Sequence, residues 1–200
     1  MHRFVLLVLL LACSARAAFA QTECPAPAVA TTPVRLAYVE EGDLWLWDVY
    51  PDATQEQPTR LLDTGDVSTV ELADDGELIV FNRQLSSAQP ELWSINTDGS
   101  GERRLIDAAQ FATMRTEIPA PDGVGIYQMG WIPGTHTLAF NTGVFYNAGL
   151  YINVADDLWT LNVDTGELLN LLPRGAGGEF LYSPDGTQIA IMTPDSLSLI

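Results

Sequence analysis

Residues 96–102 (NTDGSGE) come closest to a metal-binding loop in this chain, because carboxylate, amide and hydroxyl oxygens lie there among glycines. Calcium is bound by such oxygens in proteins, but the twelve-residue calcium loop needs a glutamate at its far end, and the spacing here does not match it. A hairpin turn accounts for the same residues. We therefore predict no metal site in this segment.

His136 is the single histidine after residue 20, and it closely follows a Pro-Gly turn signal. One histidine by itself builds neither a zinc site nor a catalytic triad. The chain also contains no Gly-x-Ser-x-Gly nucleophile motif and no glycine-rich phosphate loop. We expect His136 to be a solvated turn residue, and we predict no catalytic residue, no metal ligand and no cofactor.

The side chains best suited to bind a partner lie in long segments between strand patterns, at residues 83–89, 107–125 and 141–156. Long loops on a rigid scaffold are where binding sites are usually built. An ordinary role in loop packing is the alternative for each of these side chains. The candidate binding residues are Arg83, Arg115, Glu117, Tyr146, Asn147 and Tyr151.

Three copies of one pattern indicate which elements hold these segments. Residues 43–48, 91–96 and 157–162 each contain an acidic residue, Leu-Trp, a variable position, an aliphatic or aromatic residue, and then Asp or Asn. This alternation is typical of a half-buried strand. Asp-Gly or Asp-Thr-Gly follows two of the copies and predicts a hairpin.

Short strand patterns separated by turn signals repeat along the chain in four units, at residues 36–62, 67–106, 126–172 and 179–200. Four antiparallel strands every roughly 40–60 residues are the signature of β-propeller blades. A β-sandwich also uses many short strands, but the recurrence of one strand and turn order favours the propeller. We predict an all-β fold in which Trp and Leu of the third strands lie between adjacent blades, and at most a turn or two of helix at residues 107–116.

The long segments are expected to share one end of the blades. In an antiparallel blade, the connections from strand two to three and from strand four to the next blade lie at one end, and they contain the three long segments. The other connections are mostly tight turns, with the exception of residues 50–58. A binding surface is therefore predicted on the loop-rich face.

Residues 183–190 (SPDGTQIA) resemble the hallmark of TolB-like (WD40-like, PD40) propeller repeats, and residues 75–81 and 92–105 resemble its weaker and neighbouring parts. The third unit departs from it at residues 131–136 (WIPGTH). The resemblance covers about residues 35–200 and implies a propeller of about six or more blades. About three and a half blades are visible here, so we expect this to be the N-terminal part of a longer product whose C-terminal segment completes the first unit.

Composition excludes some partners. Hydrophobic residues make up 47% of the chain and charged residues 18%, which is typical of a folded protein. The formal net charge is −17, and all nine basic residues are arginines. Such an acidic surface repels phosphate backbones and anionic lipid headgroups, so we predict that the protein does not bind nucleic acid.

Residues 1–20 are predicted to be an export signal, with a basic start, an apolar run and a small-x-small cleavage site at residues 18–20. The run is too short to span a bilayer. Residues 10–13 (LLAC) also resemble a bacterial lipobox, in which Cys13 would carry a lipid anchor, but Cys13 lies unusually early, which favours ordinary cleavage. Residues 21–34, rich in Pro, Ala and Thr, form a tether with a lone Cys24. Either interpretation places the protein outside the bacterial cytoplasm, as a secreted, periplasmic or surface-tethered protein.

Two main functions remain open. The leading hypothesis is an exported, non-catalytic propeller that binds a protein, peptide or glycan partner, and the TolB resemblance implies protein interaction in the cell envelope. The alternative is the substrate-gating propeller of a prolyl-oligopeptidase-type serine peptidase, whose hydrolase domain would lie beyond residue 200. A metal-dependent, lactonase-like propeller is a third hypothesis, and an unchanged melting temperature after EDTA addition would remove it.

Residues 21–200 produced alone are expected to self-associate or to be poorly soluble, because an open set of blades presents an unpaired strand edge and an uncovered apolar face. Size-exclusion chromatography and thermal unfolding measure this. A monomer with one sharp cooperative transition would contradict the prediction.

Overall fold

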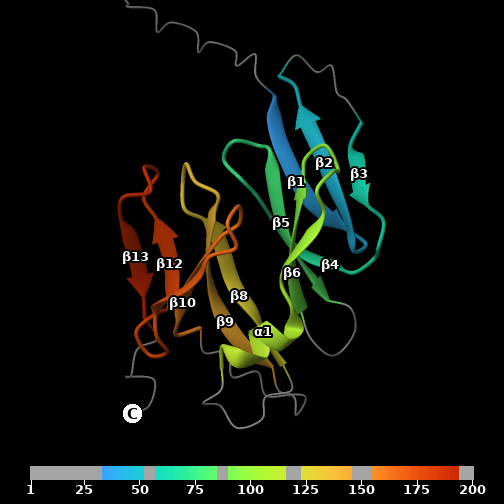
Figure 1. Ribbon diagram of the computed structural model, residues 1–200. Helices are drawn as coiled ribbons and strands as arrows, with labels where there is room; N and C mark the ends of the chain where they lie inside the picture. The colour runs from blue at the N-terminus through green and yellow to red at the C-terminus, as the bar shows by residue number, and fades with distance from the viewer. Residues whose placement is uncertain (1–32, 52–56, 85–89, 116–122, 146–154, 194–200) are drawn as a thin grey trace, which may run out of the picture. The chain divides into compact units, whose positions relative to one another are not determined.

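The computed structural model describes residues 33–51, 57–84, 90–115, 123–145 and 155–193, which belong to one compact unit, Thr31–Ile200 (Figure 1). Among these residues the strands form four separate antiparallel sheets that follow one another along the chain. The all-β prediction of partial propeller blades is confirmed by these sheets. No helix of the described segments is long and apolar enough to cross a membrane.

The second and third sheets are complete four-stranded blades whose strands pair in sequence order. Each uses one short turn between its first and second strands and another between its third and fourth strands. The second sheet contains β4 (Val67–Leu72), β5 (Leu78–Gln84), β6 (Pro90–Asn96) and β7 (Arg103–Ile106), and the third contains β8 (Gly123–Trp131), β9 (Thr137–Phe145), β10 (Leu158–Asn162) and β11 (Leu168–Leu172).

The first and fourth sheets have fewer described strands. The first pairs β1 (Val34–Glu40) with β2 (Asp43–Val49) and β2 with β3 (Thr59–Leu62), and the fourth pairs β12 (Glu179–Tyr182) with β13 (Ile189–Met192). The acid-Leu-Trp pattern lies on β2, β6 and β10, and the last two are the third strands of their sheets. By this equivalence, β1 to β3 correspond to the second to fourth strands of a blade.

One short helix, α1 (Ala108–Thr113), connects the second and third sheets. Asp107 is its N-cap and accepts a hydrogen bond from the Gln110 backbone N–H, while the Gln110 side-chain oxygen accepts a hydrogen bond from the Asp107 backbone N–H. This capping box stabilises so short a helix. Phe111 of α1 is buried in the core between the second and third sheets, and the predicted short helical segment is therefore present.

Leu and Trp of the repeated pattern pack on opposite faces of their sheets. Leu44, Leu92 and Leu158 are all fully buried. Leu44 and Trp93 share the core between the first and second sheets, where Phe81 also lies. Leu92 and Trp159 share the core between the second and third sheets. Leu44 and Leu92 therefore face the following sheet, while Trp93 and Trp159 face the preceding one. The prediction that these residues lie between adjacent blades is confirmed, and their opposite directions are a finding of the structure.

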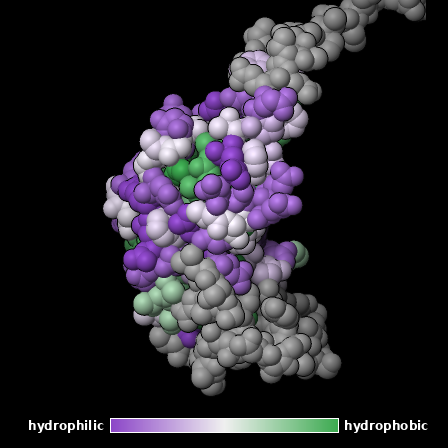
Figure 2. All heavy atoms as spheres, turned by 90° about the vertical axis from the view of Figure 1, so that its right-hand side faces the viewer, coloured by the Kyte–Doolittle hydropathy of each residue, from purple (hydrophilic) through white to green (hydrophobic). Residues whose placement is uncertain are grey.

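The face of the first sheet that points away from the second sheet is less covered. Val34 and Leu36 are 59% and 43% exposed. Tyr38 stacks on Trp45, with ring centroids 6.4 Å apart. Figure 2, which views the side of the molecule on which β3 lies in Figure 1, shows hydrophobic residues exposed between hydrophilic ones. Exposed apolar side chains on the open face of a sheet favour self-association, which is the behaviour predicted from the sequence.

The connections between strands of the second to fourth sheets lie at two opposite ends of the strands. We call one group the turn end; it contains residues 73–77, 97–102, 132–136, 163–167 and 183–188. We call the other the loop end; it contains residues 85–89, 107–122, 146–157 and 173–178, and α1 lies there (Figure 1). The connections at residues 107–122 and 146–157 are longer than any of these turns, whereas residues 85–89 and 173–178 are as short as the turns. The sequence-based expectation of long segments at this end is therefore correct for two of the three segments, and it is wrong for residues 83–89, because β5 extends to Gln84.

Leu92→Ala is expected to lower the free energy of unfolding by about 2–5 kcal/mol, because it removes a fully buried side chain and leaves a cavity between two sheets. Leu169→Ala, at a leucine that is 52% exposed, is the matched control and is expected to cost less than about 0.5 kcal/mol. Urea unfolding followed by tryptophan fluorescence measures both. Equal losses would contradict the packing between the second and third sheets.

Candidate functional site

In two copies of the acid-Leu-Trp pattern, the acidic residue accepts a hydrogen bond from the tryptophan two positions later. The Trp93 indole N–H donates to Glu91 Oε2 at 3.0 Å, and the Trp159 indole N–H donates to Asp157 Oδ2 at 2.9 Å. Glu91 is 8% exposed and Asp157 is 2% exposed. A carboxylate so deeply buried is costly unless further donors or a cation compensate its charge.

In the first two sheets the cation comes from the neighbouring strand. Arg60 on β3 lies opposite Trp45, and Arg104 on β7 lies opposite Trp93. Arg60 Nη1 lies 3.2 Å from the acidic residue of its sheet, Asp43, and Arg104 Nη1 lies 3.0 Å from the equivalent acid. The pattern is therefore an acid, a tryptophan and an arginine from the adjacent strand.

The third sheet lacks this arginine, because Asn170 lies opposite Trp159. Its acid, Asp157, has a cation from elsewhere in the chain: Arg115 Nε lies 3.5 Å from Asp157 Oδ2. Arg115 follows α1 in the connection between the second and third sheets. The one sheet without an arginine opposite its tryptophan is therefore the sheet whose acid pairs with an arginine from a distant connection, Arg115.

Arg115 is fully buried, with 1% of its surface exposed, and its guanidinium donates to three protein oxygens at 2.6 Å. Nη1 donates to Asp156 Oδ1, while Nε and Nη2 donate to the side-chain and backbone oxygens of Thr142. Thr142 in turn donates its N–H and its hydroxyl to Asp157. We name Arg115, Thr142, Asp156 and Asp157 the buried ion network.

The buried ion network lies at the bases of two long connections. Arg115 is followed directly by residues 116–122, and residues 146–154 are followed closely by Asp156. Arg174, from the connection after β11, places its Nε 3.3 Å from Asp156 Oδ2. Three loop-end connections are therefore joined through one pair of carboxylates.

Arg83, the other described candidate, lies at the end of β5 against the first sheet. Its Nη2 is 2.9 Å from Glu102, and its Nε is 3.5 Å from Asp66, an ion-pair contact rather than a hydrogen bond. The guanidinium carbon lies 4.7 Å from the centroid of the Trp93 ring, a cation–π contact. Arg83 thus connects the loop end to the aromatic residue of the repeated pattern.

The remaining candidates lie outside the described residues. Thr142 and Asp156 were not among the predicted site residues, since neither residue type nor spacing distinguishes them in the sequence. One signal was present for Asp157, because its copy of the pattern has Asn170 where the other copies have an arginine. The candidates outside the described residues are Glu117, Tyr146, Asn147, Tyr151 and the lipidation candidate Cys13.

A second cluster of titratable groups lies at the turn end, around His136. His136 Nε2 lies 2.8 Å from Asp75 Oδ2, and Nδ1 lies 3.0 Å from Asp164 Oδ2. The hydrogen bond with Asp75 is the largest cause that raises the pKa of His136 above 6.5; burial opposes it, and the hydrogen bond and charge of Asp164 add to the rise. The side chain is 29% exposed and borders a hollow of about 330 Å³.

These two clusters differ in what they can do chemically. The buried ion network has its donors and acceptors directed at one another, which suits a positioning role. The His136 cluster is open to solvent and can exchange a proton. Within the described ranges, no group of three or more His, Cys, Asp or Glu side chains is arranged to hold a metal ion.

Arg115→Ala is expected to lower the free energy of unfolding by about 3–5 kcal/mol, because it leaves buried carboxylates without their cation. Arg174→Ala removes the 44% exposed partner of the same Asp156 carboxylate and is expected to cost about 1 kcal/mol or less. Chemical denaturation of both variants measures the difference. Equal losses would show that burial does not determine the strength of these ion pairs.

No family model matches this chain, and no curated protein matches it. Solved structures that it is similar to include an oligogalacturonate lyase in complex with manganese, at 17% identity and a TM-score of 0.48, covering 77% of this chain and 37% of that chain. A putative TolB from Agrobacterium tumefaciens matches at 18% identity and a TM-score of 0.45, over 70% of this chain and 45% of that one. TolB from Acinetobacter baumannii matches at 14% identity and a TM-score of 0.41, over 81% and 47%.

The chain spans less than half the length of each of these three solved structures. TolB proteins are thus among the structures that it resembles, as the repeat motifs indicated. Its own successive antiparallel sheets, two of them four-stranded, are those of partial β-propeller blades.

Proposed function

We propose that this chain is an exported, non-catalytic β-propeller module that binds a protein, peptide or glycan partner through its loop end. The observation that supports this most strongly is the buried ion network. Arg115, Asp156 and Asp157 join the bases of the two longest loop-end connections inside the protein. A loop whose ends are held in this way loses less conformational freedom when its tip engages a partner.

The turn end is less suited to recognition, because its polar groups already join neighbouring sheets. Arg35 of the first sheet donates to the Gly76 carbonyl at 2.8 Å. Arg103 donates to the Val163 carbonyl at 2.6 Å. The Gly134 N–H donates to Asp74 Oδ2 at 2.9 Å. The turn end therefore fastens the sheets to one another and leaves the loop end for a partner.

Charge narrows the class of partner. With a net charge of −17, the protein attracts basic or neutral surfaces and repels polyanions. A protein or peptide with a basic surface and an uncharged glycan both fit this condition, whereas nucleic acid does not. The aromatic and amide side chains Tyr146, Asn147 and Tyr151 would make the contacts, with Glu117 as a charged neighbour and with Arg83 and Arg115 as supports.

The proposal includes export of the protein from the cytoplasm. Residues 1–20 would direct the chain out of the bacterial cytoplasm, and residues 21–34 would separate the folded part from the site of cleavage or from a lipid at Cys13. The partner would then be an extracytoplasmic molecule.

A photo-crosslinking amino acid placed at Thr113, exposed on α1 at the loop end, is expected to give a crosslinked species in cells that produce the full-length chain. The matched control is Thr165, which is exposed in the β10–β11 turn at the turn end. Gel electrophoresis and mass spectrometry measure the yield and identify the product. Several-fold more product at Thr113 supports the proposal; equal yields, or a larger yield at Thr165, would refute the choice of face.

A further inference from the structure

Three turns from two adjacent sheets meet around the His136 imidazole. His136 ends the β8–β9 turn, Asp75 lies in the β4–β5 turn of the preceding sheet, and Asp164 lies in the β10–β11 turn. The three residues border one hollow of about 330 Å³ together with Asp74, Gly134 and Thr135. The imidazole is therefore placed between the second and third sheets, with one ring nitrogen directed at each.

Both ring nitrogens face a carboxylate oxygen. Nε2 lies 2.8 Å from Asp75, and Nδ1 lies 3.0 Å from Asp164. A neutral imidazole has one N–H and one lone pair, so it can donate to one carboxylate while its lone pair faces the other. Only the imidazolium ion can donate to both. Both hydrogen bonds therefore form only when His136 is protonated, and one of them is lost when it is neutral.

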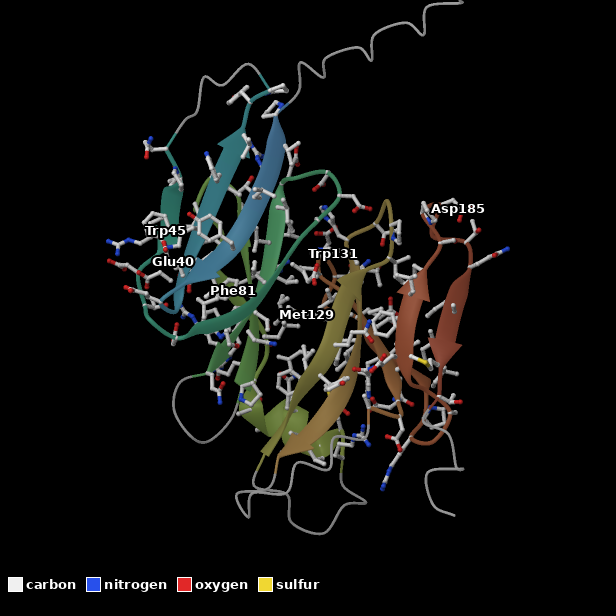
Figure 3. All side chains as sticks on the ribbon, turned by 180° about the vertical axis from the view of Figure 1, so that it is seen from behind. Glu40, Trp45, Phe81, Met129, Trp131 and Asp185 are labelled. Carbon is white, nitrogen blue, oxygen red and sulfur yellow. The ribbon has the colours of Figure 1, made fainter. Side chains whose placement is uncertain are left out.

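The surrounding charges favour the imidazolium ion. Asp74 of the β4–β5 turn binds the Gly134 N–H. Arg103 of β7 donates to the Val163 carbonyl, next to Asp164. Asp185 belongs to the β12–β13 turn, at the turn end (Figure 3), where hydrogen bonds from Ser183 and Thr187 lower its pKa to about 2. Three aspartates, Asp74, Asp75 and Asp164, border the hollow beside His136. Two arginines lie near them, because Arg35 donates to the Gly76 carbonyl next to Asp75 as Arg103 does to the Val163 carbonyl.

We propose that His136 is a proton-operated latch between the second and third sheets, bridging Asp75 and Asp164 as the imidazolium ion and releasing one of them as the neutral imidazole. The Asp74–Gly134 hydrogen bond does not involve His136, so the sheets stay in register when the latch opens. What changes is the spacing of the β4–β5 and β10–β11 turns, and with it the hollow that they border.

The pH range of the latch follows from the directions of the two pKa shifts. The pKa of His136 is raised above 6.5 in the folded protein, so its stabilising contribution is complete below pH 6.5 and is lost as the pH rises through the raised pKa. Hydrogen bonds from the Glu77 backbone N–H and from His136 lower the pKa of Asp75 below 3.8. The latch is therefore closed in mildly acidic solution and opens toward alkaline pH.

The pKa of His136 can be measured in the intact chain from the rate of hydrogen exchange at its imidazole C2 position, read by mass spectrometry after digestion. His2 lies in a different peptide and does not contribute to the signal. We expect a pKa above 6.5 that falls toward the ordinary value in Asp75→Asn and in Asp164→Asn. Asp98→Asn is the matched control, because Asp98 is another turn-end aspartate whose partner is Ser100, and it is expected to leave the His136 pKa unchanged.

Thermal unfolding supplies a second measurement that does not depend on a particular Asn variant. The midpoint of the natural chain should exceed that of His136→Gln by more at about pH 5.5 than at about pH 8.5, on either side of the ordinary histidine value. A His136 pKa at or below 6.5 would overturn the proposal. A midpoint difference that is the same at both pH values would overturn it as well, because it would indicate packing rather than a proton.

Discussion

The acid-Leu-Trp pattern places a carboxylate in or beside a core between sheets, at Asp43, Glu91 and Asp157, and each of these charges has an arginine beside it. Glu91 and Asp157 each hold a tryptophan indole, which places a large aromatic surface against the preceding sheet. An unpaired buried carboxylate would cost several kcal/mol. The first two sheets supply an arginine from the adjacent strand. The third supplies Arg115 from a distant connection, so the same requirement fastens the loop end to the sheet.

The contacts at the two ends of the sheets consequently differ. At the turn end, backbone groups and short polar side chains join neighbouring sheets directly, as Arg103 does with the Val163 carbonyl. At the loop end, the connections are joined to one another through the buried ion network. A scaffold with one fastened end can tolerate long insertions at the other without losing the alignment of its sheets. The proposed binding face and the proposed His136 latch thus occupy opposite ends of the same strands.

Much of the fold could be predicted from the sequence because its repeated units are local. The pattern around Leu92 and Trp93, together with the Asp-Gly turns, predicts a strand whose Leu and Trp lie between adjacent sheets, and this agrees with the structure. The strand begins two residues earlier than predicted, at Pro90, and it is covered on both faces rather than on one. The ion network could not be predicted in the same way, because Arg115 and Asp156 are 41 residues apart and no pattern links them. His136 was predicted to be a turn residue, but its two carboxylate partners come from other turns, whose approach depends on how the sheets pack.

The opposite placement of Leu and Trp on each sheet has a consequence for symmetry. Because Leu44 meets the sheet that carries Trp93, and Leu92 meets the sheet that carries Trp159, the two sides of a sheet are unlike and complementary. Contacts of this kind are heterologous, so they propagate in a single direction and are not satisfied by a twofold axis. The series of sheets is therefore polar, and a sheet inserted in the reverse sense would place tryptophan against tryptophan and leucine against leucine.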